Sequence, residues 1–294
     1  MIKAFRVAEH TFQLEMPDAC PLWGMLQQYD PFITDTSAEP LFKVTLVSSL
    51  PECDLVPLIV EEPEPGASRI DLYGAGGSYL IRMAPFATAP LSAEFMISGD
   101  MREGRLKILG HSASSALYGV NNALMLLFAF ATADKMTLEM HSSVTVNDGK
   151  GYMFLGKSGT GKSTHSSLWL KYIPGSELLN DDNPIIRVGE DGVTRVYGSP
   201  WSGKTPCYRN AEAPVGAIVR INQAKENVIT RYSVLEAYAS VYSSCSGFKA
   251  DRKMSDGLHR TLEHIALNVP CYKLDCRPDE EAAVVCSKEV KSQN

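Results

Sequence analysis

The chain has 294 residues, of which 45% are hydrophobic, and this is enough to bury the core of one large domain or two modest ones. Its 28 Lys and Arg against 34 Asp and Glu give a formal net charge of -6, and the basic residues are scattered. This distribution argues against a nucleic-acid partner, because binding a polyanion requires a concentrated basic patch.

The N-terminal segment MIKAFRVAEHTFQLEM lacks the apolar core and cleavage site of a signal peptide. The most apolar run, 116–135, contains Asn121 and Asn122 and has no basic flank, so we expect a buried helix and no membrane partner. Seven cysteines without a CxxC pair are typical of reduced thiols. The sequence therefore predicts a cytoplasmic protein, and it leaves open whether the chain forms a homo-oligomer.

The first hundred residues predict mostly β structure. The expected elements are strands over 3–16 and 41–47 and a short helix between them over 21–29. An irregular segment rich in Pro and acids is expected over 49–68, and hairpins over 69–85 and 93–110. The hairpins are expected to turn at Gly74–Gly77 and near Gly104. The glycines of the first turn suggest no nucleotide site, because apolar alternation continues on both sides and no helix follows.

From Ser112 the pattern becomes α/β. The expected helices are 115–133, one from 161, 232–246, 251–268 and one from 280, and the expected strands are 136–146, 151–156, 184–197, 214–221 and 271–276. We therefore predict a β-rich N-terminal domain over 1–110 and an α/β domain over 111–294.

A phosphate-binding loop is the clearest motif. GKSGTGKS at 156–163 matches GxxxxGK[ST] between an apolar strand and a helix, the context that gives this pattern its meaning. In such a loop backbone N–H groups and the helix N-terminus converge on phosphate oxygens. The expected nucleotide-binding residues are Gly156, Lys157, Ser158, Gly159, Thr160, Gly161, Lys162, Ser163 and Thr164. The alternative interpretation is a glycine-rich strand-to-helix turn with two incidental lysines.

Within this motif Lys162 is expected to reach the β and γ phosphates and Ser163 to ligate Mg²⁺. Nineteen residues after Lys162 the sequence LLNDDNPIIR contains Asp181 and Asp182. Paired acids commonly form turns. Beside a nucleotide, however, one of them can hold the metal while the other accepts a proton from a hydroxyl.

Three further residues are candidates for the same site. His141, in TLEMHSSVTV, lies near a strand that could neighbour the loop strand, although a single histidine is more often a packing residue. Lys204 and Arg209, in the segment 198–214, are available to neutralise phosphate charge, with solvated surface cations as the alternative.

Together these motifs resemble the superfamily of HPr kinase/phosphorylase and ATP-dependent phosphoenolpyruvate carboxykinase. The resemblance extends over Leu138–Asn183 and rests on LEMHSSVTV, GKSGTGKS and LLNDD in that order. It implies an α/β (α+β) fold with a mixed β core, the phosphate loop and flanking helices. It also implies ATP as the nucleotide, Mg²⁺ or Mn²⁺ as the metal, and His141 near the metal and the reacting groups.

One departure separates the two activities of that superfamily. The carboxykinases carry a lysine pair on the helix before the histidine, and the corresponding positions here are Asn121 and Asn122. A neutral amide does not replace an ammonium that stabilises an enolate. We therefore expect an ATP-dependent kinase that acts on a hydroxyl of a protein serine or a small metabolite, with Asp181 as base. A divergent carboxykinase-like enzyme and a non-catalytic nucleotide-binding partner protein are the alternatives.

Overall fold

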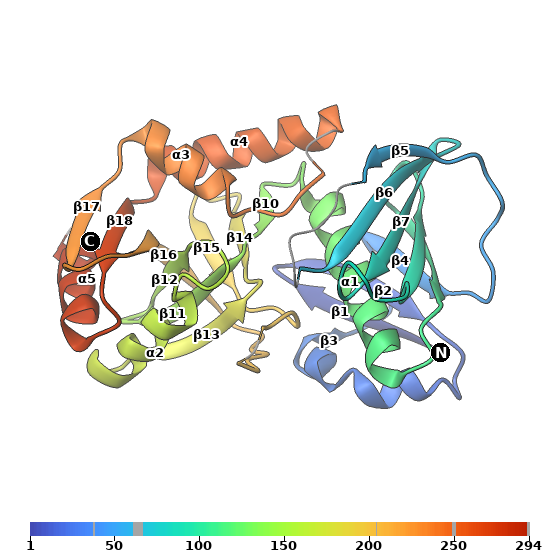
Figure 1. The fold of residues 1–294 in the computed structure, drawn as a ribbon, viewed down its shortest axis with the longest axis horizontal. Helices are drawn as coiled ribbons and strands as arrows, with labels where there is room; N and C mark the ends of the chain where they lie inside the picture. Colours follow the sequence, from blue (N-terminus) through green and yellow to red (C-terminus); the bar gives the residue numbers. More distant parts are fainter. Residues whose placement is uncertain (38, 61–66, 204, 249–250, 293–294) are drawn as a thin grey trace. The chain divides into compact units, whose positions relative to one another are not determined.

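The structure is a computed structural model that describes residues 1–294 except 38, 61–66, 204, 249–250 and 293–294. The chain folds as two compact units, Met1–Ala131 and Thr132–Asn294 (Figure 1). Each unit contains one large mixed sheet and few helices, so the fold is of the mixed α/β class. The division between the units falls at the end of helix α1 (Ala113–Thr132), which packs with the first unit.

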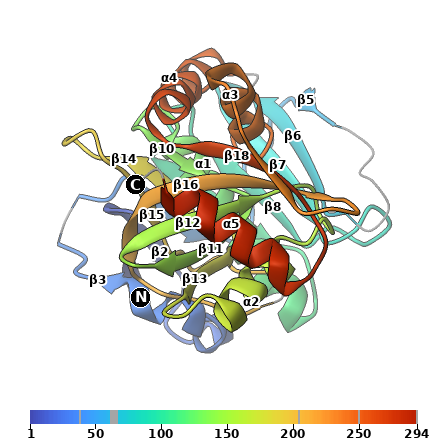
Figure 2. The ribbon, with the colours of Figure 1, turned by 90° about the vertical axis from the view of Figure 1, so that its left-hand side faces the viewer.

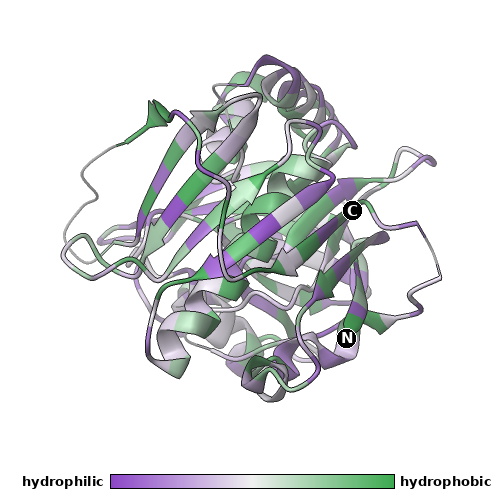
Figure 3. Cartoon of the chain, turned by 90° about the vertical axis from the view of Figure 1, so that its right-hand side faces the viewer, coloured by the Kyte–Doolittle hydropathy of each residue, from purple (hydrophilic) through white to green (hydrophobic). Residues whose placement is uncertain are grey.

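The first unit contains a nine-stranded sheet in the order β3-β1-β2-β4-β9-β8-β7-β6-β5. Its strands are β1 (Ile2–Val7), β2 (His10–Glu15), β3 (Ile33–Thr34), β4 (Phe42–Leu46), β5 (Val56–Ile59), β6 (Arg69–Ala75), β7 (Ser78–Ala84), β8 (Ala93–Ile97) and β9 (Glu103–Ile108). Two 3-10 helices, η1 (Pro21–Met25) and η2 (Gln27–Phe32), stand where one short helix was expected. Hydrophilic and hydrophobic residues alternate along the strands, as expected for a sheet with one buried face (Figure 3).

Two local predictions in this unit are wrong, and one hairpin is confirmed. The strand expected over 3–16 is a hairpin, because Ala8 and Glu9 adopt positive φ of 45° and 64° and turn the chain. The hairpin expected to turn near Gly104 forms between β8 and β9, with Ile97 opposite Gly104, and a Cβ at Gly104 would meet the Phe95 ring at 2.5 Å. Strand β5 forms within the segment expected to be irregular.

Helix α1 is, among the described residues, the one helix long and apolar enough to cross a membrane. Its Val120, Leu124 and Phe128 side chains are fully buried, and the Phe128 ring lies 6.0 Å from that of Phe12 on β2. The helix is therefore a core element of the first unit, as the sequence predicts.

The second unit contains a sheet in the order β10-β14-β15-β16-β12-β11-β13, with β18 beside β16 and β17 beside β18 (Figure 2). Its strands are β10 (Thr137–Glu139), β11 (Ser142–Asn147), β12 (Lys150–Leu155), β13 (Glu177–Asp182), β14 (Ile185–Val188), β15 (Thr194–Tyr197), β16 (Glu212–Gln223), β17 (Val228–Arg231) and β18 (Cys271–Cys276). Its helices are α2 (Lys162–Tyr172), α3 (Val234–Tyr242), α4 (Arg252–Asn268) and α5 (Glu280–Ser292).

Both faces of this second sheet are buried. Along β12 the side chains alternate, so that Met153 and Leu155 pack with α3 and α4 while Tyr152 and Phe154 pack with α2 and α5. A central strand with two buried faces reads as a continuous apolar run, which is why YMFL is apolar throughout. The packing on both sides fixes the end of β12, where the phosphate loop begins.

Trp169 on α2 anchors this helix to the sheet, and its substitution tests the packing. Its ring is fully buried, 4.9 Å from Tyr152 and 5.5 Å from Phe154. We expect Trp169→Ala to lower the free energy of unfolding by about 3–5 kcal/mol, because a large cavity replaces the indole. Leu170→Ala is the matched control on the next residue, which is 42% exposed, and should change stability by less than about 0.5 kcal/mol. Equal losses in urea unfolding of both variants would contradict this assignment.

Candidate functional site

The phosphate loop lies at the edge of the sheet where β12 ends and α2 begins. Strand β12 pairs in parallel with β16, with Leu155 opposite Arg220. Gly156 follows, and a Cβ there would lie 2.3 Å from Thr160 Oγ1, so only glycine lets the loop close. Gly161 caps α2 with φ of 105°, a conformation that side-chain-bearing residues rarely adopt. The glycines of the motif are therefore required by the loop's own geometry.

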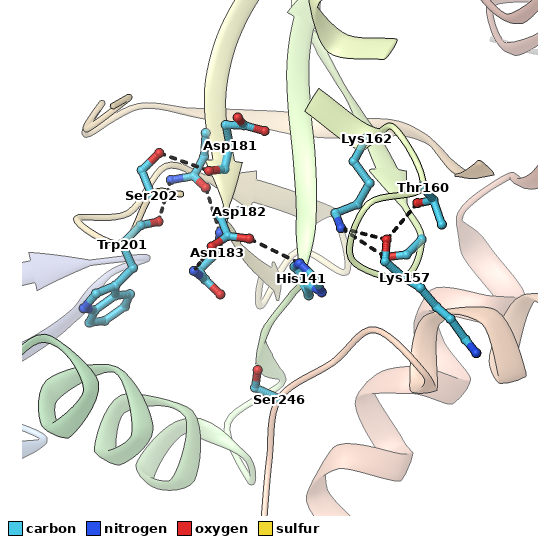
Figure 4. Close-up of polar contacts among 12 residues, drawn as sticks. His141, Lys157, Thr160, Lys162, Asp181, Asp182, Asn183, Trp201, Ser202 and Ser246 are labelled. Carbon is cyan, nitrogen blue, oxygen red and sulfur yellow. Dashed lines mark hydrogen bonds and ion pairs between the residues drawn. The ribbon is translucent and has the colours of Figure 1, made fainter. Parts of the chain in front are cut away.

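Lys162 folds back over the loop from the first turn of α2 (Figure 4). Its ammonium donates a hydrogen bond to the Gly156 carbonyl at 3.1 Å, and the residue is only 8% exposed. Burial lowers the pKa of this ammonium, the positive charge of Arg220 acts in the same direction, and the Asp182 and Asp181 carboxylates oppose both. A buried cation at the N-terminus of a helix is well placed to bind an anion.

The paired acids reach the loop through the strand register. Strand β11 pairs with β12 on one side and with β13 on the other, so Ser142 lies opposite Asp182 and Ser143 opposite Asp181. His141 directly precedes β11, and its Nε2 lies 3.2 Å from an Asp182 carboxylate oxygen (Figure 4). Asp182 itself has φ of 141°, a strained backbone of the kind that clusters at functional sites.

A polar cavity of about 370 Å³ brings most of the predicted residues together. Its lining residues are His141, Ser158, Gly159, Gly161, Lys162, Ser163, Thr164, Asp181, Asp182 and Gly203. Asp181 is 4% exposed, and among the described residues no group donates a hydrogen bond to its carboxylate. This carboxylate is therefore available to accept a proton from a bound molecule.

A second cavity of about 480 Å³ adjoins the first, because both are lined by Gly159, Gly161 and Thr164. It is more apolar, and its remaining lining residues are Thr160, His165, Leu168, Ile221, Gln223, Ala224, Cys276, Arg277 and Pro278. The two cavities together offer a charged region and an apolar region on either side of the loop. Sequence reasoning did not predict the second cavity, because it combines α2, β16 and the end of β18.

Two buried titratable residues near the loop were also not predicted. His165 is 2% exposed, its Nε2 accepts a hydrogen bond from Trp169 Nε1 at 3.1 Å, and burial lowers its pKa to about 4. Glu139 is 1% exposed, and burial together with the charge of Asp182 raises its pKa to about 8. Burial therefore favours the neutral form of both groups. The sequence did contain a signal for His165, because residues three apart on a helix are neighbours and His165 follows Lys162 at that spacing on α2.

The remaining predicted residues lie elsewhere. Lys204 is outside the described residues. Arg209 is 43% exposed and pairs with the Glu177 carboxylate at 2.8 Å, so the structure does not bring it into the polar cavity. Gly156 and Lys157 form the loop without lining that cavity, and Thr160 donates a hydrogen bond to the Lys157 carbonyl at 2.8 Å.

The polar cavity has ligands suited to a hard cation. In the described part of the chain no cluster of three or more His, Cys, Asp or Glu side chains is arranged to hold a metal by itself. The Ser163 hydroxyl and the carboxylates of Asp181 and Asp182 line one cavity, and oxygen donors of this number fit Mg²⁺, which keeps water and phosphate oxygens as its other ligands. The residues present therefore fit a metal bound jointly with a nucleotide.

No family model and no curated protein matches the sequence. Among solved structures, an HPr(Ser) kinase/phosphatase from Coxiella burnetii aligns with 53% of this chain and 89% of its own, at 12% identity and a TM-score of 0.33. At these values the comparison establishes neither a shared fold nor a shared activity.

The buried His165 predicts a pH dependence of stability. Its folded pKa of about 4 lies below its ordinary value of 6.5, so its contribution is complete above pH 6.5 and is lost as the pH falls to about 4. Across that window we expect the free energy of unfolding to fall by about 3 kcal/mol on account of this residue. His165→Gln keeps an acceptor for Trp169 and does not titrate, so denaturant unfolding at pH 7 and 4.5 should show a smaller loss in the variant. The same loss in both proteins would show that His165 is not responsible.

Proposed function

We propose that the second unit is an ATP-dependent phosphotransferase that moves the γ-phosphoryl group to a hydroxyl of a protein serine or a small metabolite. The supporting observation is that Lys162, Ser163, His141 and both aspartates line one polar cavity. Phosphoryl transfer depends on positioning and charge neutralisation more than on covalent chemistry, and this set of residues provides both. A glycine-rich turn with incidental lysines would leave unexplained a buried lysine that lines the same cavity as two aspartates.

The loop would hold the triphosphate. Gly159, Gly161 and the N-terminal turn of α2 line the cavity, where their backbone N–H groups would bind phosphate oxygens. The Lys162 ammonium would leave the Gly156 carbonyl for a β or γ phosphate oxygen. Ser163 and Asp182 would hold Mg²⁺, or Mn²⁺, which when bound neutralises charge on the transferring group. His141 lies beside Asp182 and would orient its carboxylate, or join it as a ligand.

Asp181 would act as the base. In the transfer, a bond forms between the acceptor hydroxyl oxygen and the γ phosphorus, and the bond between that phosphorus and the β–γ bridging oxygen breaks. The hydroxyl proton passes to the Asp181 carboxylate, and ADP leaves. The carboxylate suits this role because Asp181 lines the cavity and, within the described chain, no group donates a hydrogen bond to its side chain.

The apolar cavity would hold the nucleoside. It begins at the loop residues that also line the polar cavity, and Leu168, Ile221 and Pro278 offer apolar surface to a flat ring. Because the two cavities adjoin at the loop, one nucleotide can fill both with its phosphates near Lys162.

Two substitutions separate nucleotide binding from transfer. Lys162→Ala should weaken ATP binding by about 10- to 100-fold, because a charge-assisted hydrogen bond in a buried position is lost. Lys171→Ala removes an exposed cation later on α2 and should leave ATP binding unchanged, which controls for net charge. Calorimetry with Mg²⁺ and ATP measures both, and equal affinities would contradict the loop assignment.

Asp181→Asn should leave ATP binding within about twofold of the wild type, because the amide retains the shape of the carboxylate. It should lower phosphoryl transfer by at least about 100-fold, because the amide does not accept the proton. The assay incubates each protein with γ-labelled ATP and a cell extract and identifies what becomes labelled. Full labelling by Asp181→Asn would remove the base from the mechanism.

The nucleoside assignment is tested by narrowing the apolar cavity. Ala224→Phe places a large ring among its lining residues and should raise the dissociation constant of ATP by about tenfold or more. Inorganic tripolyphosphate, which has no base, should bind both proteins equally. If the variant weakens both ligands to the same extent, or neither, the base does not occupy this cavity.

A further inference from the structure

Arg220 is a basic residue that neither the sequence pattern nor the proposed function uses. It lies on β16 opposite Leu155, the last residue before the phosphate loop. Its neighbours Val219 and Ile221 pack on the face of the sheet that α2 covers, whereas the Arg220 side chain reaches Ser240 on α3, on the opposite face. Arg220 is thus held beside the loop but on the other side of the sheet from the apolar cavity.

The guanidinium of Arg220 is surrounded by neutral oxygens. Its Nε donates to Ser240 Oγ at 2.7 Å, and its Nη2 donates to Ser243 Oγ and Ser244 Oγ, each at 2.8 Å, and to the Ser240 carbonyl. Within the described part of the chain no carboxylate pairs with this residue, and no acceptor meets Nη1. Arginine in a half-buried position normally pairs with a carboxylate or a phosphate, so this side chain lacks an anion.

A structural role explains only part of this arrangement. The Ser240 carbonyl is at the C-terminal end of α3, where a cation stabilises the helix dipole. Yet the positive charge of Arg220 also lowers the pKa of Lys162, which means that two half-buried or buried cations repel each other at this edge of the sheet. An anion bound between them would relieve that repulsion.

The serine turn also connects Arg220 with the polar cavity. The Ser244 carbonyl accepts the backbone N–H of His141 at 2.7 Å, and His141 lines that cavity. The Ser244 hydroxyl accepts from Arg220, and among the described residues it donates to none, so its own proton is available. Arg220 is thus linked through Ser244 to His141, a residue of the polar cavity, and Arg220 Nη1 and the Ser244 hydroxyl are two donors that no described residue uses.

We propose that Arg220 and Ser244 form an oxyanion subsite, and that the hydroxyl acceptor is a small molecule carrying a phosphate or carboxylate group that binds there. The subsite belongs to the acceptor rather than the nucleotide, because the apolar cavity lies on the α2 face of the sheet and Arg220 on the α3 face. The identification of the ligand as an acceptor rests on the proposed phosphotransferase function, whereas the existence of the subsite does not.

The test measures binding of three probes by calorimetry without nucleotide: glycerol 3-phosphate, glycerate and uncharged glycerol. The wild type should bind at least one charged probe and should not bind glycerol, and the stronger of the two identifies phosphate or carboxylate as the preferred group. Arg220→Met should raise the dissociation constant of the charged probe by about tenfold or more, because a charged hydrogen-bonding partner is lost. Arg260→Met, on the exposed face of α4, is the matched control and should bind as the wild type.

Ser244→Ala supplies a second variant in case Arg220→Met does not fold, because it removes only the hydroxyl donor. It should weaken the charged probe by about fivefold. The proposal is overturned if no charged probe binds, if glycerol binds equally well, or if both variants bind like the wild type. It is also overturned if Arg220→Met weakens ATP rather than the probes. If the wild type does not bind ATP, the proposed phosphotransferase function is overturned, whereas binding of a charged probe would still support the oxyanion subsite.

Discussion

The backbone pairing of β12 with its two neighbours is the constraint on which the site depends. Parallel pairing with β16 and antiparallel pairing with β11 bring the ends of several strands to one edge of the sheet. The loop, the paired acids at the end of β13 and the histidine before β11 meet there because backbone hydrogen bonds fix the register of each strand. A slip of one residue in the register of β13 would move the side chain of Asp181 and that of Asp182 each to the other face of the sheet, and the cavity would be lost.

Packing on both faces makes this edge rigid. The α3 and α4 helices bury Leu155 from one side, and α2 and α5 bury Phe154 from the other. A close-packed interior has low compressibility, so the loop can keep Lys162 buried and Asp182 in a strained backbone. The stability of the sheet thus offsets the cost of a buried ammonium and a strained backbone, and such costly features are common at active sites.

Charge is distributed unevenly around the loop. Lys162 and Arg220 are half-buried or buried cations at the end of β12, and Asp181 and Asp182 provide carboxylates on β13. The separation suits a reaction in which negative charge moves between two bound molecules, with cations to hold the phosphates and one carboxylate to receive a proton. No sequence pattern distinguishes Arg220, which is one arginine in an apolar strand, and only its contacts in the structure mark it as a candidate anion-binding residue.

The sequence by itself determined the loop, the helix after it and the buried character of α1, since these depend on glycine conformation, on residues four apart and on local hydrophobicity. It did not separate β1 from β2, because Ala8 and Glu9 carry no turn signal, and it did not predict the exposed strand β17. Only the tertiary structure decided that His141 meets Asp182, that Arg209 pairs with Glu177 and that Arg220 sits among serines. These contacts join residues far apart in the chain, and their register follows from packing of the whole sheet rather than from any local preference.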